Sequence, residues 1–419
     1  DVAQKTSNVG QLRLLPGEGS LDLVGQLDPV FAVNYQGWLS LELSGHRARR
    51  SNARALAMDA NRALKCLLEK CKNGNIQPLP TRVEVERAEF VEFAATGDEA
   101  ENLRAEWHLL GFRKTGIHID KNVELWRQNN INLVLNTEEH GFAHSCAVMH
   151  GACVCDIGFL VDDAQNARER AKALGIKPFG QFRHQGELDI PAVRGVGGSA
   201  LHFLDGDSEL SGVWSKEFKP VHVSDEPTIG LKTIDHIAQV VRTEELPSAL
   251  GFYESLFHFH KTSRAQIREP GGVVQSVALE SENGAVKITL NANDTHRTFA
   301  GRFATDRMGA SVQHLAFSTD DIFATAKALS KNGFPILEIG GAYYDELGAR
   351  FDLSDKEIKN LASLNLFYDC DEKGHAYCQL YSRPKKNGFF FEIVQRDKDY
   401  AGFGARNALY RTIALKRAL

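Results

Sequence analysis

The chain has 419 residues, 43% of them hydrophobic, and a formal net charge of −5, so it can bury two or three globular cores. This slightly acidic balance argues against nucleic acid or an anionic membrane as a partner. The sequence has no apolar run that could span a bilayer, no signal segment and no disulfide or zinc spacing among its seven cysteines, which predicts a soluble, cytoplasmic protein with reduced thiols.

The N-terminal part reads as strand and helix pieces of an α/β unit. A glycine-rich turn at residues 15–19 precedes a predicted strand at 38–43. Apolar residues at helical spacing then predict a helix over 51–72, with Glu69 on its solvent face. Two prolines within residues 75–80 indicate a linker.

Beyond this linker, the chain carries one module twice. The segment 151–163 is echoed by 309–321, and each copy reads as a strand followed by an alanine-rich helix. Upstream, a strand and helix that begin near Phe90 are echoed by a strand and helix near His236. We therefore expect two modules of a strand, a helix and further strands, joined near residues 210–230.

The two copies differ at the positions where metal-binding side chains are expected. Phe90 stands in the first copy where the second has His236, and Asp156 stands where the second has His314. We therefore expect no metal triad in the first module.

In the second module, three polar side chains fall on apolar strands. His236 and His314 each share a strand face with apolar neighbours, and Glu392 is the lone carboxylate of an apolar strand. A single strand histidine is more often structural than a ligand, and Glu392 could instead pair with Arg383 or Arg396. However, a buried carboxylate needs a cation, and two imidazoles with one carboxylate are the ligand set of non-haem Fe(II) oxygenases. The pattern predicts one metal site, and the same ligands also accept Mn, Co, Ni or Mg.

Ordered short motifs run from about Ala88 to the C-terminus. They include residues 312–317, 368–374 and 391–396. This part of the chain resembles 4-hydroxyphenylpyruvate dioxygenase, a member of the vicinal oxygen chelate superfamily. The resemblance implies an α+β fold of two tandem glyoxalase- and dioxygenase-type modules of paired βαβββ units, at residues 80–215 and 228–419.

The same resemblance implies roles for single residues of the second module. His236, His314 and Glu392 would bind Fe(II) or another divalent metal. The implied substrate pocket contains Ser276, Asn291, Gln313, Gln379, Phe403 and Asn407. The implied partners are a small 2-oxo acid and O2, and the oligomeric state stays open, with a homo-oligomer allowed.

The chain departs from the family pattern around this pocket. Thr289 and Asn293 stand where the family usually has prolines, residues 298–300 read Thr-Phe-Ala where it has a Ser-Gln pair, and Tyr381 stands where phenylalanine is common. A missing amide leaves polar groups of a substrate unpaired, which changes specificity without disturbing a metal. We therefore expect the fold and the metal site to carry over, but not the substrate.

The first 75 residues are similar to the end of a sugar-phosphate-isomerase-like (β/α)8 barrel. In particular, they resemble the end of the barrel in bacterial 3-dehydroshikimate dehydratases. In those proteins the barrel is fused ahead of a hydroxyphenylpyruvate-dioxygenase-like half. The resemblance implies that Glu42 is one ligand of a divalent metal in the barrel. A barrel needs about 250 residues, so we expect a chain that begins inside its first domain. The longer protein would convert 3-dehydroshikimate to protocatechuate in quinate and shikimate catabolism.

Two functions stay open for the dioxygenase-like half. One is a metal-dependent dioxygenase that acts on a 2-oxo acid, which the intact ligand set favours. The other is a catalytically silent metal-binding module that stabilises or regulates the fused dehydratase, which the altered pocket favours.

Overall fold

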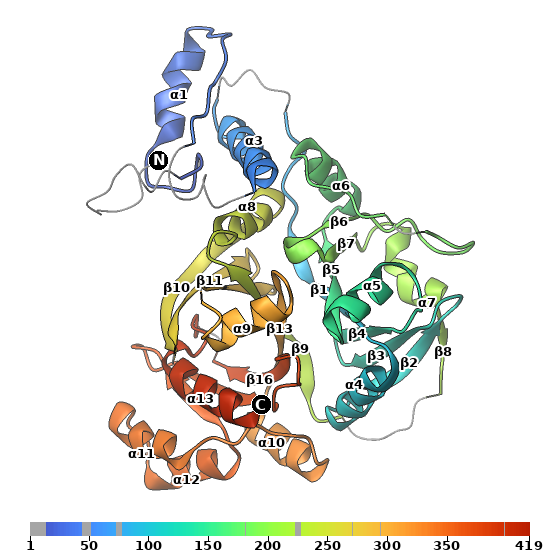
Figure 1. Cartoon of the computed structure of the whole chain (residues 1–419), viewed down its shortest axis with the longest axis vertical. Helices are drawn as coiled ribbons and strands as arrows, with labels where there is room; N and C mark the ends of the chain where they lie inside the picture. Colours follow the sequence, from blue (N-terminus) through green and yellow to red (C-terminus); the bar gives the residue numbers. More distant parts are fainter. Residues whose placement is uncertain are drawn as a thin grey trace.

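Two eight-stranded sheets dominate the computed structural model, which describes residues 14–43, 52–72, 78–180, 182–222, 228–269, 271–293, 295–397 and 399–419. The two modules lie side by side, with the N-terminal helices α1 (Leu23–Ala32) and α3 (Ala53–Glu69) beyond α8 (Leu246–Leu256) (Figure 1).

The first sheet belongs to the first module. Its strands, in chain order, are β1 (Val85–Ala94), β2 (Arg113–His118), β3 (Val123–Gln128), β4 (Ile131–Asn136), β5 (Cys153–Val161), β6 (Ala192–Arg194), β7 (Ala200–Leu204) and β8 (Phe218–Pro220). Its helices are α4 (Gly97–Leu109), α5 (Gly141–His150), α6 (Ala164–Ala173) and α7 (Val213–Glu217). Because β8 pairs with β2, this sheet extends past the expected boundary at residue 215.

The second sheet belongs to the second module. Its strands are β9 (Leu231–Arg242), β10 (Phe259–Glu269), β11 (Gly272–Ser281), β12 (Lys287–Asn293), β13 (Ser311–Thr319), β14 (Phe367–Cys370), β15 (Ala376–Tyr381) and β16 (Phe390–Arg396). Besides α8, its helices are α9 (Phe299–Asp306), α10 (Ile322–Lys331), α11 (Gly341–Arg350), α12 (Asp355–Ser363) and α13 (Ala408–Ala418).

The two sheets share one central topology. In the first, β5 pairs antiparallel with β1, while β4 and β7 flank this pair in parallel. In the second, β13 pairs antiparallel with β9, while β12 and β16 flank this pair in the same way. Central strands buried on both faces should be mainly apolar, and in β5, where all nine residues are buried, Asp156 is the one charged residue. The predicted α+β fold of two tandem modules is confirmed.

The repeated helices begin and end in the same way. Asp163 caps α6 by accepting a hydrogen bond from the Asn166 amide, and Asp321 caps α10 in the same manner. Gly175 and Gly333 follow the two helices with φ angles of 73° and 75°, a left-handed conformation that glycine adopts without strain. The same local sequence signals therefore mark where both helices begin and end.

The expected strand at residues 38–43 was wrong. This segment has no regular secondary structure, and Trp38 is 95% exposed. A strand needs a hydrogen-bonded neighbour to be stable, and within residues 14–43 and 52–72 the structure has helices but no strand. Glu42 consequently projects from an irregular, exposed segment.

Glu69 is exposed at the end of α3, as expected, but it also has a buried partner that the sequence did not indicate. The fully buried Arg170 of α6 donates to both carboxylate oxygens of Glu69, at 2.7 and 3.0 Å. Arg170 also donates to the carbonyl oxygens of Ser255 and Pro80. This ion pair fixes the end of α3 between the two modules.

We expect Arg170→Ala to lower the free energy of unfolding by about 3 kcal/mol, because it leaves buried acceptors without their donor. Urea unfolding followed by circular dichroism measures the change. Arg168→Ala on the same helix is the control: Arg168 is partly exposed and its ion pair with Asp189 spans 3.4 Å, so its loss should cost less than about 1 kcal/mol. Equal losses in both variants would contradict the prediction.

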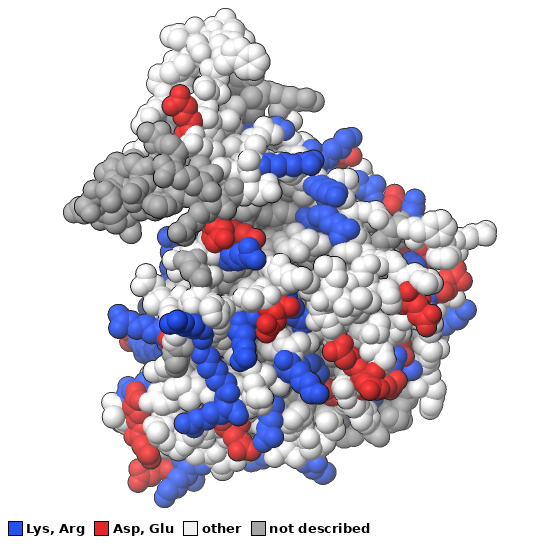
Figure 2. Space-filling view, viewed as in Figure 1, with Lys and Arg blue, Asp and Glu red and all other residues white. Residues whose placement is uncertain are grey.

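On the face shown in Figure 2, acidic and basic side chains of the described residues are interspersed over both modules. Interspersed charges give a weak net field. Among the described residues, none of the helices combines the length and apolar character of a membrane span. All seven cysteines are free thiols.

Candidate metal centre

Three buried side chains of the second module converge on one point. The Nε2 atoms of His236 and His314 lie 3.2 Å apart, and Oε2 of Glu392 lies 3.5 and 3.3 Å from them. Each residue is at most 4% exposed. Ligand atoms at about 2.0–2.2 Å from a shared ion are about 3 Å from one another, so the spacing fits a single divalent metal.

The strand register explains why these residues meet. His236 on β9 and Glu392 on β16 flank the same residue of β13, Ala316. Because strand side chains alternate between faces, His314 shares the face of Ala316. The small alanine leaves room above it for the three larger side chains.

Glu392 has one satisfied and one unsatisfied oxygen. Oε1 accepts hydrogen bonds from Gln379 Nε2 at 2.9 Å, Tyr381 at 3.0 Å and Tyr377 at 3.4 Å. Oε2 is buried and has no hydrogen-bond partner. Burial opposes the charge, but His236 and His314 hold the pKa of Glu392 well below its ordinary value. The unpartnered oxygen faces the two imidazoles, where a cation would complete the site.

The alternative ion pairs of Glu392 do not form. Arg383 pairs with Glu338 at 2.6 Å. Arg396 instead pairs with Asp235 at 2.9 Å. The carboxylate therefore depends on the histidines and on any bound metal for its charge balance.

The two imidazoles are held in ligand orientation. Asp235 Oδ1 lies 2.8 Å from Nδ1 of His236, which leaves Nε2 free for the site, and Arg396 holds Asp235 in turn. The His314 ring stacks on Phe390, with centroids 4.6 Å apart. Burial lowers the pKa of His314 to about 4, so this imidazole is neutral at physiological pH. Burial opposes the charge of His236, but Glu392 and Asp235 raise its pKa, so this imidazole releases its proton when a metal binds. Neutral imidazoles are the form that binds metals.

No other three His, Cys, Asp or Glu side chains of the described residues converge in this way. The exposed Glu42 stands apart from any such group.

A cavity of about 350 Å³ opens onto the two histidines. Ser276 on β11 and Asn291 on β12 are paired across the sheet and line this cavity. Phe403 also lines it and meets the His236 ring edge-on, with centroids 5.3 Å apart. These three residues line the cavity, as substrate contacts would require, and their contact with a substrate stays a prediction.

The other three predicted pocket residues lie outside the lining of this cavity. Gln379 donates to Glu392, and Asn407 donates to Gln379 Oε1 at 3.1 Å. Gln313 is buried beside His314 in sequence, and its Nε2 has no hydrogen-bond partner among the described residues. The structure thus gives Gln379 and Asn407 a role in holding Glu392, while their substrate contacts stay a prediction.

The residues that depart from the family pattern also have defined positions. Thr289 lines the cavity. Asn293 accepts from the Thr295 amide, and Thr298 caps α9. Phe299 is buried against Phe390.

Asp235 and Tyr377 were missed by sequence reasoning. Because Asp235 directly precedes His236 in the sequence, its role beside this predicted ligand could have been recognised. Tyr377, Gln379 and Tyr381 alternate along β15 and so share one face, and Tyr381 pairs with Glu392 in the register. That alternation beside a predicted ligand was the available signal.

In the first module, the equivalent positions hold Phe90, Asp156 and His202. Phe90 on β1 and His202 on β7 flank Gly158 of β5. His236 and Glu392 flank Ala316 of β13 in the same way. A Cβ at Gly158 would lie 2.1 Å from the Phe90 ring. The aromatic ring therefore fills the space that the ligand atoms occupy in the second module.

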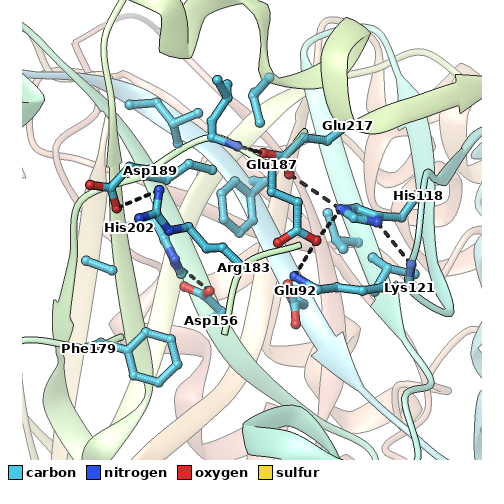
Figure 3. A pocket seen from close by; sticks show the side chains of 18 of the residues that line it. Glu92, His118, Lys121, Asp156, Phe179, Arg183, Glu187, Asp189, His202 and Glu217 are labelled. Atoms are coloured by element: carbon cyan, nitrogen blue, oxygen red, sulfur yellow. Dashed lines mark hydrogen bonds and ion pairs between the residues drawn. The ribbon is translucent and has the colours of Figure 1, made fainter. Parts of the chain in front are cut away.

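A cavity of about 430 Å³ opens beside these residues (Figure 3). His202 pairs with Asp156 at 2.6 Å, and Lys121 pairs with Glu187 at 2.8 Å. Burial and the nearby Asp156 raise the pKa of Glu92 to about 7, so this carboxyl is partly protonated near neutral pH. The polar groups of this cavity balance one another and do not form a metal-ligand triad.

The tandem fold and the triad together define a vicinal oxygen chelate protein. Residues 81–219 match the family described as "Hydroxyphenylpyruvate dioxygenase, HPPD, N-terminal", and residues 233–369 match the "Glyoxalase/Bleomycin resistance protein/Dioxygenase superfamily". A 4-hydroxyphenylpyruvate dioxygenase from Pseudomonas aeruginosa is 32% identical over 78% of this chain and 92% of its own length. The chain belongs to the 4-hydroxyphenylpyruvate dioxygenase family.

Longer relatives match nearly the whole chain. A 3-dehydroshikimate dehydratase from Pseudomonas aeruginosa is 37% identical over 97% of this chain, and one from Pseudomonas putida is 36% identical over the same share. The chain spans 66% of the length of both relatives.

Solved structures agree with this assignment. A "xylose isomerase-like TIM barrel/4-hydroxyphenylpyruvate dioxygenase fusion protein" superposes with a TM-score of 0.86 and 33% identity, over 100% of this chain and 68% of that one. A variant 4-hydroxymandelate synthase from Streptomyces coelicolor has a TM-score of 0.69 and 22% identity, over 80% of this chain and 99% of its own, and supports the fold alone. The predicted resemblance to the dioxygenase half of a barrel fusion is confirmed.

Proposed function

We propose that the second module is a metal-dependent dioxygenase that acts on a small 2-oxo acid with O2. The observation that carries this proposal is the unpartnered, buried Oε2 of Glu392 facing Nε2 of both His236 and His314. An apolar site of this kind keeps such a carboxylate only if a cation balances it. Two imidazoles and one carboxylate leave coordination positions open, as non-haem Fe(II) oxygenases require.

The side chains of the site have two roles: some would bind the metal, and others orient these ligands. His236, His314 and Glu392 would hold Fe(II), which supplies the oxygen chemistry when bound. Asp235 fixes the His236 tautomer, and Gln379 with its tyrosine neighbours orients Glu392. In the cavity, Ser276 and Asn291 offer hydrogen bonds to a substrate, and Phe403 covers the face beside His236.

The decisive experiment combines metal analysis of anaerobically prepared protein with oxygen uptake on a panel of 2-oxo acids. The proposal expects one Fe(II) per chain and uptake with at least one acid. The second candidate is a catalytically silent metal-binding module that stabilises or regulates a fused dehydratase. It is favoured by the departures from the family pattern at Thr289, which lines the cavity, and at residues 298–300. Stoichiometric metal without uptake on any acid would support the silent module.

If the dioxygenase proposal holds, 4-hydroxyphenylpyruvate should be a poor substrate. The Thr-Phe-Ala sequence at 298–300 offers no amide where the family has one, and Phe299 is buried against Phe390. Each lost hydrogen-bond partner costs about 1–3 kcal/mol, or about 5- to 150-fold in kcat/KM. We expect kcat/KM at least tenfold below that of the Pseudomonas aeruginosa 4-hydroxyphenylpyruvate dioxygenase in the same oxygen-uptake assay.

Fe(II) content is the control for this comparison, because the ligands are intact and loading should be normal. An equal kcat/KM for the two proteins would show that the pocket residues are misplaced.

For a longer protein that includes a complete barrel, we propose 3-dehydroshikimate dehydratase activity, with protocatechuate as the product. The 37% identity to the Pseudomonas aeruginosa dehydratase supports this proposal. We further propose a cytoplasmic location, and domain limits near residue 75, at 80–220, where β8 completes the first sheet, and at 228–419. Limited proteolysis that cuts within residues 73–80 and 221–230 would test the limits.

A further inference from the structure

A basic side chain enters the cavity of the candidate metal centre. Arg411 on α13 lines the same cavity as His236 and His314. Its Nη1 donates to the Tyr381 hydroxyl at 3.3 Å, and its guanidinium carbon lies 5.6 Å from the centre of that ring. Arg411 forms no salt bridge with any carboxylate of the described residues. Most of its five N–H donors therefore remain available to a ligand.

The nearest acidic groups are engaged elsewhere. Glu269 accepts from the Phe299 amide at 2.8 Å and from the Thr412 hydroxyl at 3.4 Å. Glu392 belongs to the triad. Asp369 and Asp371 also line the cavity, and they pair with Arg406 at 3.8 Å and with His375 at 2.8 Å. None of these carboxylates forms an ion pair with the guanidinium of Arg411.

In the first module, charged side chains of the cavity are neutralised by other side chains of the same module. In its equivalent cavity, Lys121 has Glu187 and His202 has Asp156 as partners (Figure 3). The second cavity has no such partner for Arg411. Burial opposes the charge of Arg411, but Tyr381, Glu392 and Glu269 raise its pKa. Its unused N–H donors therefore point to a ligand that supplies acceptor oxygens.

The charge of the loaded site leads to the same conclusion. A divalent metal with Glu392 and two neutral imidazoles carries one net positive charge, which the carboxylate of a chelating 2-oxo acid neutralises. Arg411 then remains beside the metal as a cation that no carboxylate of the described residues pairs with. A second negative group on the ligand would pair with it.

Two other arginines reach this cavity from its outer wall. Arg264 is exposed on β10. Arg406 is exposed and donates to the Cys370 carbonyl oxygen at 3.0 Å. Water solvates exposed guanidinium groups well, so these two need no ligand acceptor. Arg411 is partly buried, so a ligand oxygen would replace water at its unused donors.

We infer that the second module binds a 2-oxo acid whose tail carries a second carboxylate, and that Arg411 binds that carboxylate. A guanidinium matches a carboxylate with two parallel hydrogen bonds, which favours this group over a neutral or phenolic tail. This inference rests on the proposed function, since it assumes that the 2-oxo acid group chelates the metal.

Calorimetric titration of the anaerobic, Co(II)-loaded full chain tests it with matched pairs of acids. The pairs are 2-oxoglutarate against 2-oxopentanoate, 2-oxoadipate against 2-oxohexanoate, and 4-carboxyphenylpyruvate against phenylpyruvate. We expect the dicarboxylate of at least one pair to bind about tenfold or more tightly. Arg411→Leu and Arg411→Gln should remove this preference, and Arg411→Lys should retain part of it. Arg417→Leu, on the same helix but outside the cavity lining, should leave it unchanged.

Oxalate separates this inference from the proposed function, because it chelates a metal and has no tail. If oxalate binds but no pair shows a preference, or if the preference survives in both neutral Arg411 variants, the inference is overturned and the metal site stands. If neither oxalate nor any 2-oxo acid binds, both are overturned. Melting temperatures of the Arg411 variants show whether each is folded.

Discussion

Replacing His236, His314 or Glu392 by alanine should abolish metal binding. The three ligand atoms lie within 4.8 Å of one another, and all are buried, so no neighbouring water-exposed group can substitute for a lost ligand. Two remaining protein ligands are fewer than the three that open catalytic sites usually keep. Metal content after anaerobic Fe(II) loading and desalting should fall from one per chain to near zero in each variant, as measured by plasma mass spectrometry.

Asp235→Ala should weaken metal binding without abolishing it, because Asp235 orients His236 but is not itself a ligand. Loss of such a partner typically weakens metal affinity about 10- to 100-fold. A competition titration with a chelator measures this loss.

The matched controls lie in the first module. Asp156→Ala and His202→Ala change the residues that stand where His314 and Glu392 stand in the second module, so metal content should stay unchanged. Loss of metal in these variants would show that the wrong module was chosen, and full occupancy in all three triad variants would remove the site altogether.

The metal centre could be predicted because its determinants are local. Alternation along β9 and β13 put His236 and His314 on apolar faces, and the internal repeat identified the strands that carry them. The lone carboxylate in an apolar strand was an equally local signal at Glu392. The sequence alone could not supply the register that brings all three beside Ala316.

The features that sequence reasoning missed depend on distant contacts. Glu69 is exposed on its own helix, as expected, but its ion-pair partner Arg170 lies 101 positions away in sequence. Arg411 belongs to a C-terminal helix whose pattern does not reveal which side chain enters the cavity. The segment 38–43 has strand-forming residues, but a strand also needs a neighbouring strand, and local sequence does not provide one.

The 419-residue chain should show no 3-dehydroshikimate dehydratase activity, although it is 37% identical to a dehydratase over 97% of its length. The resemblance gives Glu42 as one ligand of a barrel metal, but Glu42 is exposed on an irregular segment, and no three metal-ligating side chains of the described residues converge near it. One exposed carboxylate binds a divalent ion too weakly to hold it.

Incubation of the purified chain with 3-dehydroshikimate and Mg²⁺ or Mn²⁺, followed by chromatography for protocatechuate, is the measurement. A longer chain with a complete barrel is the positive control and should form protocatechuate. Glu42→Ala in that longer chain should reduce the rate by a hundredfold or more, on the order of 3 kcal/mol in transition-state stabilisation, whereas His236→Ala should leave a barrel reaction largely intact. Protocatechuate formed by the 419-residue chain would place a complete dehydratase site within it and contradict the assignment of Glu42 to a metal site that needs further barrel ligands.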